Sequence, residues 1–227
     1  MRAAGIGVAL AICAGLLWLT VLFLQILYWT GHNPGETSFM RARLEALRDK
    51  DPRVELRHRW VDYNHISRHL KRAVIAAEDA RFADHEGFDW EGIQRAIERN
   101  REKGKLVAGG STITQQLAKN LFLSGERSFL RKGQEAIITG LLEATMDKRR
   151  IFEIYLNVVE WGEGVFGAEA AARHYYGVGA TALSPEQSAR LAAMLPRPRF
   201  YDRNRQSAYL ARYSAAILAR MTAAQIP

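Results

Sequence analysis

The sequence predicts a mainly α-helical domain preceded by one N-terminal transmembrane helix, and two patterns support this prediction. Residues 3–29 contain no formal charge, and a membrane-spanning helix needs about 20 predominantly apolar residues. From Ile66 onward the apolar residues recur at helical spacing, as in Ile66, Leu70 and Val74. Alternating strand patterns are scarce. The chain of 227 residues has room for the anchor and one domain of ordinary size.

The apolar segment is interpreted as an uncleaved anchor. Removable signal peptides have shorter apolar cores, of about 7–15 residues, and a small-residue cleavage site. This segment is longer and ends in two aromatic residues, Tyr28 and Trp29. We expect Trp18 and Phe23 to face lipid and the terminal pair to lie at the membrane interface. A buried core helix is the alternative.

Two short segments connect the anchor to the domain. Residues 31–36 are predicted to form a linker, and residues 39–50 a charged amphipathic helix close to the membrane. In that helix Phe39, Leu44 and Leu47 are expected to point inward.

Later helices carry clear start and stop signals. Thr112–Gln115 and Ser184–Gln187 each fit a capping box, in which a hydroxyl and a glutamine satisfy free backbone N–H groups. Gly177 and Pro196 mark helix ends. Residues 54–61 are the one stretch that favours extended structure. We therefore expect about eight to ten helices, in a class of domain whose clefts carry the chemistry.

Charge and cysteine content narrow the classes of partner and site. The chain has 32 Lys and Arg against 24 Asp and Glu, a formal net charge of +8. Such a balance favours polyanionic partners, namely phosphates, anionic lipid or nucleic acid. Cys13 is the single cysteine and lies in the apolar segment, which excludes a disulfide framework and a cysteine metal site.

An acidic segment at residues 78–87 is the first candidate for catalysis. It holds four acids and one histidine and follows a helix that is expected to end near Ala77. A carboxylate such as Glu78, at a helix end beside Phe82 and other acids, can have a pKa raised enough to act as a general base. The alternatives are a solvated acidic loop and, for His85, a structural hydrogen-bonding role.

A second candidate is the helix start after Gly109 and Gly110. Free N–H groups and the helix dipole make such a start attractive to phosphate. The apolar stripe of this helix leaves Ser111, Gln115 and Lys119 on another face, where they can reach one ligand. A nucleotide-binding P-loop is excluded by the spacing. An ordinary capped helix is the alternative.

A third candidate is a basic turn. Arg127 precedes a helix that begins with Arg131 and Lys132 and carries Glu135 three to four residues later. These residues fit a pyrophosphate clamp in which the carboxylate orients the cations or helps to hold a divalent ion. A surface salt bridge of little energetic value is the alternative.

Together these segments resemble the peptidoglycan glycosyltransferases of family 51, and most closely the monofunctional biosynthetic transglycosylases. Four family motifs occur in order. The matching residues are Glu78, Asp79, Phe82, His85 and Gly87 in the first motif, Gly109 to Asn120 in the second, Arg131, Lys132 and Glu135 in the third, and Lys148, Ile151, Glu153, Tyr155, Leu156 and Asn157 in the fourth. Phe152 replaces the usual Leu of the fourth motif, an apolar exchange.

The resemblance implies a lysozyme-like, two-lobed helical fold on the outer, periplasmic side of the cytoplasmic (inner) membrane. It implies a single-pass anchor at residues 1–30, a linker and membrane-proximal segment at residues 31–60, and a glycosyltransferase domain at residues 61–227. The expected reaction polymerises lipid II into β-1,4-linked glycan with inversion and releases undecaprenyl pyrophosphate. Expected partners are lipid II, the growing glycan strand, the membrane and cell-wall synthesis proteins, but no nucleic acid.

Site roles follow from the same resemblance. Glu78 is expected to be the general base, supported by Asp79, Phe82, His85 and Gly87. Glu135 is expected to order the cations or bind Mg²⁺ or Mn²⁺. The residues expected to hold substrate and its diphosphates are Ser111, Gln115, Lys119, Asn120, Arg127, Arg131 and Lys132. Phe122, Leu123 and Phe129 are expected either to enter the interface and receive prenyl chains or to pack in the core.

Two other functions are compatible with parts of the sequence, whereas a third is not. Transpeptidase activity is not expected, because the chain contains no Ser-x-x-Lys or Lys-Thr-Gly signature. A muramidase that cleaves peptidoglycan with Glu78 as its acid is the enzymatic alternative, but hydrolysis of a neutral glycan needs no cationic cluster. A membrane-tethered basic module that binds anionic lipid or nucleic acid is the non-enzymatic alternative, and acids beside its ligand would oppose binding.

Overall fold

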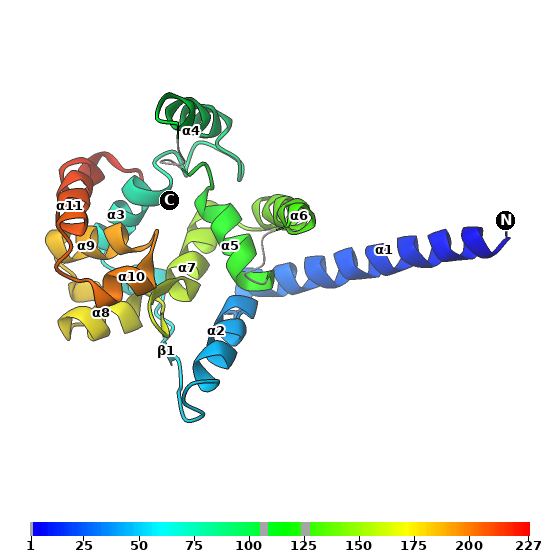
Figure 1. The fold of residues 1–227 in the computed structure, drawn as a ribbon, viewed down its shortest axis with the longest axis horizontal. Coiled ribbons are helices and arrows are strands. Elements are labelled where there is room, and N and C mark those ends of the chain that lie inside the picture. The colour runs from blue at the N-terminus through cyan, green and yellow to red at the C-terminus, as the bar shows by residue number, and fades with distance from the viewer. Residues whose placement is uncertain (1, 105–108, 124–127) are drawn as a thin grey trace.

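The computed structural model describes residues 2–104, 109–123 and 128–227, with side chains from Gly5 onward (Figure 1). Its described part is mainly helical, which confirms the predicted fold class. The α-helices are α1 (Arg2–Gly31), α2 (Ser38–Arg48), α3 (Arg68–Glu78), α4 (Trp90–Glu102), α5 (Ile113–Phe122), α6 (Phe129–Thr145), α7 (Lys148–Val158), α8 (Ala168–Tyr176), α9 (Pro185–Met194), α10 (Pro198–Arg203) and α11 (Ala208–Arg220). Short 3₁₀ helices occupy Tyr63–His65, Ala180–Ala182 and Met221–Ala223.

Helix α1 projects away from the domain as a single long rod (Figure 1). Its stretch Gly5–Gly31 is long and apolar enough to cross a membrane. Trp18 and Phe23 are exposed as predicted, whereas Leu22 and Ile26 are buried where the helix meets the domain. A buried core helix is thereby ruled out for most of α1, because only its last turns pack against protein.

The junction between α1 and the domain is fixed by specific contacts. The Arg150 side chain of α7 donates from Nε to the Trp29 carbonyl (3.0 Å) and from Nη2 to the His32 carbonyl (2.6 Å). The Trp29 ring also packs on Phe122 of α5, with ring centroids 5.2 Å apart. Trp29 therefore packs against the domain, while Tyr28 is exposed.

The membrane-proximal helix and the extended stretch are both shorter than predicted. Helix α2 ends at Arg48, and Met40 is its most buried residue, while the three residues that were expected to point inward are half-buried. Strand structure at residues 54–61 is confined to β1 (Arg57–His58).

A small sheet closes the side of the domain near α2. Its strands follow the order β1-β3-β2, with β1 parallel to β3 (Val165–Phe166) and β2 (Glu160–Gly162) antiparallel to it. Residue Arg57 pairs with Val165, and Glu160 pairs with Phe166. The sheet places Glu160 beside α2 and α10.

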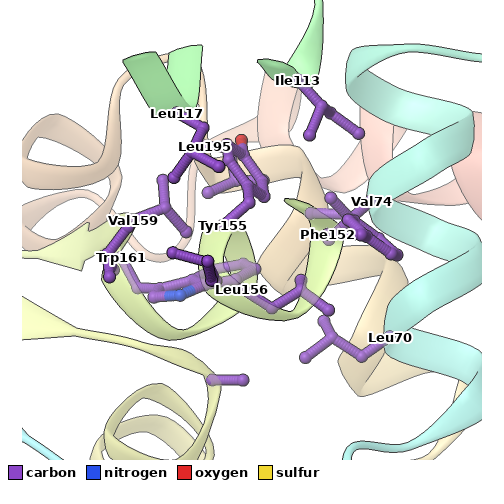
Figure 2. Packing of buried hydrophobic residues seen from close by; sticks show 14 of the residues in the cluster. Leu70, Val74, Ile113, Leu117, Phe152, Tyr155, Leu156, Val159, Trp161 and Leu195 are labelled. Carbon is purple, nitrogen blue, oxygen red and sulfur yellow. The ribbon is translucent and has the colours of Figure 1, made fainter. Parts of the chain in front are cut away.

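Helix α7 is the centre of the core, because nearly all of its residues from Ile151 onward are buried. Figure 2 shows Val74 of α3 beside Phe152 of α7, with Leu70 in the same buried cluster. Phe152 also packs on Phe82, with centroids 5.5 Å apart, so the exchange from the family's Leu fills core space. Tyr155 lies on the same helix, completely buried.

The predicted start and stop signals of the later helices are confirmed. Both capping boxes form, with Thr112 and Gln115 at the start of α5 and with Ser184 and Gln187 at the start of α9. Helix α8 ends at Gly177, whose positive φ of 68° suits a residue without a side chain. Helix α9 ends just before Pro196, and α10 follows at once.

Candidate active site

Glu78 is the last residue of α3, and its half-buried carboxylate is held by one amide. Gln116 of α5 donates from Nε2 to Glu78 Oε2 at 2.8 Å. Burial raises the pKa of the Glu78 carboxyl, the Gln116 hydrogen bond lowers it, and the charge of Asp79 raises it again. A smaller lowering comes from Lys119. A carboxylate with a raised pKa and a fixed orientation is suited to general base catalysis.

Tyr155 orients the amide of Gln116. The Tyr155 hydroxyl donates to Gln116 Oε1 at 3.0 Å, so the amide nitrogen is the atom that faces Glu78. Burial raises the pKa of Tyr155 well above 10, and the nearby charges of Glu78 and Asp79 raise it further. The phenol therefore stays protonated and remains a donor.

Gln116 was not among the predicted site residues, although its spacing from Lys119 and Asn120 indicates a place in the site. It lies three and four residues before Lys119 and Asn120, so all three share one face of α5. The neighbouring Gln115 was predicted instead. Its side chain lines the same pocket, but its Oε1 accepts from the Thr112 backbone N–H at 3.0 Å and so caps the helix.

Asp79 connects the acidic segment to the start of α5. Its Oδ2 accepts from the Ile113 backbone N–H at 3.0 Å, and its Oδ1 lies 2.9 Å from His85 Nε2. Both Asp79 and the His85 side chain are largely buried, which excludes a wholly solvated acidic loop. His85 therefore has a structural contact with Asp79, as the alternative interpretation expected.

Gly87 also connects the acidic segment to α5, and its surroundings explain why the motif has a glycine at this position. Its carbonyl accepts from the Thr112 hydroxyl at 2.7 Å. Its φ is 83°, and an added Cβ would lie 2.7 Å from Thr139 Cγ2. A larger residue is excluded by both strain and contact. Phe82 is completely buried under this segment, with the Lys148 ammonium 4.7 Å from its ring centroid.

The cations form a second cluster on α5 and α6. Arg131 Nη1 lies 3.1 Å from Glu135 Oε2, and Lys132 forms an ion pair with Glu135 Oε1. Burial lowers the pKa of Lys119, while the negative charge of Glu135 raises it. Arg127 lies outside the described residues.

Three cavities surround α5. The base pocket, of about 240 Å³, is lined by Glu78, Ser111, Gln115, Gln116, Lys119, Glu135, Leu195 and Pro196. The α10 chamber, of about 530 Å³, shares Gln116, Lys119, Leu195 and Pro196 with that pocket and adds Asn120, Glu160 and residues of α10. The anchor chamber, of about 630 Å³, lies between α1 and α6 and includes Phe122, Leu123, Leu130 and Arg131.

The structure thus brings most of the predicted site residues together. Five of them line the base pocket, and the others that the structure describes are distributed around it. Asn120 lines the α10 chamber, Arg131 lines the anchor chamber, and Lys132 reaches the pocket through Glu135.

The residues around Glu135 do not form a metal site on their own. Each of its oxygens is already paired with a cation, Oε1 with Lys132 and Oε2 with Arg131. Within residues 2–104, 109–123 and 128–227, no group of three His, Cys, Asp or Glu side chains is placed to hold a metal ion. In this structure Glu135 is paired with two cations and so holds Arg131 and Lys132 together.

Comparison with known proteins identifies the family of the chain. The family model described as Transglycosylase matches residues 45–222, well over half of the chain. The chain belongs to the transglycosylase family.

Relatives of this transglycosylase are similar over almost their whole length, and each is named a biosynthetic peptidoglycan transglycosylase. The protein from Janthinobacterium sp. (strain Marseille) is 65% identical, over 90% of this chain and 89% of its own. The relative from Herminiimonas arsenicoxydans is 63% identical over 93% and 92%. A third, from Methylobacillus flagellatus, is 59% identical over 97% and 96%.

Proposed function

We propose that this transglycosylase is a peptidoglycan glycosyltransferase that polymerises lipid II into β-1,4-linked glycan strands with inversion. Lipid II is a disaccharide with an acidic peptide, joined by a diphosphate to a polyprenyl chain. The observation that carries the proposal is the base pocket, where Glu78 is held by Gln116 and faces the same cavity as Lys119 and Glu135. One pocket thus offers a base and a cation beside each other.

The proposed reaction is a displacement at the anomeric carbon. The 4-hydroxyl oxygen of the acceptor forms the new bond to that carbon, while the bond from the carbon to the diphosphate oxygen of the donor breaks. Glu78 takes the hydroxyl proton, as carboxylates do for water in inverting glycosidases. The leaving diphosphate keeps the electron pair and is neutralised by Lys119, Arg131 and Lys132, with Arg127 proposed as a fourth cation.

The anchor chamber suits the prenyl part of the substrate. Its walls combine apolar residues of α1, α5 and α6 with a few polar side chains, and Arg131 lies among them. A diphosphate bound at Arg131 would leave its lipid chain beside Leu22, Phe122 and Leu123. Leu123 is buried and Phe129 is 99% exposed, so of the three predicted lipid-contacting residues Phe129 is the one free to enter the interface.

The location that fits this chemistry is the inner membrane, with a single-pass anchor and the catalytic domain on the periplasmic side. Helix α1 supports the anchor, because its outer turns are exposed apolar surface. The orientation is proposed from the substrate, since glycan strands are polymerised outside the cytoplasm. Proteins of cell-wall synthesis are proposed as partners on the same side.

The purified full-length protein with labelled lipid II tests the proposal. Wild type should produce glycan polymer, and Glu78→Gln should produce none while remaining folded. Glu86→Gln removes an exposed acid of the same segment and should polymerise normally. Near-normal turnover by the Glu78 variant would remove this residue as the base, and inactive wild type would overturn the function.

Two further arms of the assay address the metal and the muramidase alternative. Because the cations already occupy both oxygens of Glu135, a chelator should change the polymerisation rate less than about twofold, a factor worth less than 0.5 kcal/mol. Finished glycan offered in place of lipid II should remain uncut, since the cationic cluster has no role in hydrolysis of a neutral polymer. Release of muropeptides from the glycan would favour the muramidase instead.

A further inference from the structure

The α10 chamber is cationic, and the proposed displacement does not use most of it. Lys119 lies where it meets the base pocket, and Arg197, Arg199 and Arg203 line the rest. Among the residues that the structure describes, Glu160 is the single carboxylate in its wall. A cavity beside the reacting atoms with such an excess of positive charge is suited to an anionic part of the substrate.

Two of these arginines are placed to bind such a group. The Arg197 guanidinium lies 4.4 Å from the centroid of the Phe200 ring, which fixes its plane. Arg197 forms no ion pair with any residue in the described ranges 2–104, 109–123 and 128–227. Arg199 Nε lies 3.8 Å from Glu160 Oε2, too far for a hydrogen bond. The donors of both side chains are therefore available to a ligand.

Glu160 does not neutralise the positive charge of the chamber. It is only 4% exposed and forms an ion pair with Arg43 of α2 at 3.1 Å, behind the chamber wall. Arg43 thus offsets part of its negative charge. Arg203 is paired with Glu163, with both contacts at 3.1 Å, which leaves Arg197 and Arg199 as the principal anion ligands.

The position of the chamber relative to the anchor indicates which anionic group of lipid II it binds, the diphosphate or the peptide carboxylates. Helix α1 leaves the domain beside α6, whereas α10 lies beyond α5 and α7, on the side away from α1 (Figure 1). A lipid-linked diphosphate must stay close to the bilayer that holds its chain. The carboxylates of the peptide are carried on the sugar and can extend away from the membrane.

We propose that the α10 chamber binds the carboxylates of the peptide carried by lipid II, through Arg197 and Arg199. This inference rests on the proposed function and adds a peptide subsite to it. The sugar would then lie between Glu78 and α10, with its peptide directed away from the anchor.

Steady-state kinetics of the full-length protein with two substrates test the subsite. The substrates are lipid II and the same lipid-linked disaccharide without its peptide. Loss of a charged hydrogen-bonded pair costs about tenfold or more in affinity, so Arg197→Gln/Arg199→Gln should raise KM for lipid II by about that factor. Its KM for the peptide-free substrate should be unchanged. Arg212→Gln, an exposed position on α11, is the matched control.

Each outcome has a defined meaning. A rise in KM that is specific to lipid II supports the subsite. An equal rise with both substrates would overturn it and assign the chamber to the diphosphate or the sugar. No rise with either would also overturn it, while polymer formation by wild type would leave the proposed function intact. Circular dichroism of the double variant checks that α10 and the rest of the fold are retained.

Discussion

Gln116 donates a 2.8 Å hydrogen bond to Glu78, and this contact joins α5 to the end of α3 at the proposed base. The amide stabilises the ionised carboxylate, whereas burial, the larger influence, favours the protonated form. Gln116 therefore limits how far burial can raise the pKa of Glu78. That balance determines the pH at which the base is ready to accept a proton.

We predict that Gln116→Met will shift the acidic limb of the rate–pH profile to higher pH. A base works only when deprotonated, so a higher pKa for Glu78 moves the rise in rate upward. Because a hydrogen bond to a charged group contributes about 1.5–3 kcal/mol, the rate on the acidic limb should fall by roughly ten- to a hundredfold. Gln94→Met, at an exposed position on α4, is the control. An unshifted limb would contradict the role of Gln116.

Tyr155 should act only through Gln116. We predict that Tyr155→Phe will shift the same limb in the same direction, by less than Gln116→Met does, because the amide keeps its position but loses its fixed orientation. Adding Tyr155→Phe to the Gln116 variant should cause little further loss, as expected for residues in one network. Fully additive losses would show that Tyr155 acts separately. Tyr209→Phe, at an exposed position on α11, controls for loss of a phenol.

The sequence predicted the parts of this site that depend on local spacing. Both capping boxes, the end of α8 and the carboxylate–cation cluster at Glu135 follow from residues within four positions of one another. Such contacts are set by helix geometry alone. The four ordered motifs then identified the family, which local spacing could not do.

What the sequence did not predict depends on contacts between distant segments. Gln116 and Tyr155 are 39 residues apart, and only the packing of α5 on α7 brings the two side chains together. Asp79 is likewise buried because it accepts from the N–H of Ile113, 34 residues later. The family motif singles out Asp79, but local spacing does not distinguish its burial from the exposure of a neighbouring acid such as Asp84.

Burial of Glu78 should carry a cost in stability. Its pKa in the folded protein lies above the ordinary value of 4.5, so the folded state holds a proton more tightly than the unfolded state does. Stability therefore falls as the pH rises from about 4.5 through the raised pKa, and it stays lowered at higher pH. We predict that Glu78→Gln will melt above wild type at alkaline pH, and that the difference will shrink towards acidic pH. Thermal unfolding followed by circular dichroism measures both proteins, and a Glu78→Gln variant that melts lower throughout would contradict the prediction.

Asp79 should be a structural residue whose loss also disturbs the site. Its carboxylate accepts from the first N–H of α5 and contacts His85, and a negative charge at a helix start is favourable. An asparagine cannot accept at both positions, so Asp79→Asn leaves a buried polar group unpaired, at a cost of about 1–3 kcal/mol. We predict that this unpaired group lowers the melting temperature and that polymerisation becomes slower.

The matched control for this variant is Asp84→Asn, which changes an exposed acid five residues later and should leave both properties unchanged. His85→Ala should also lower the melting temperature. Because it removes only one of the two partners of Asp79, its effect should be smaller than that of Asp79→Asn. Because Gln116 lies on the helix that Asp79 holds, both variants should also reduce the maximal rate. If Asp79→Asn melted like wild type yet lost all activity, Asp79 would have to act on the substrate directly rather than through α5.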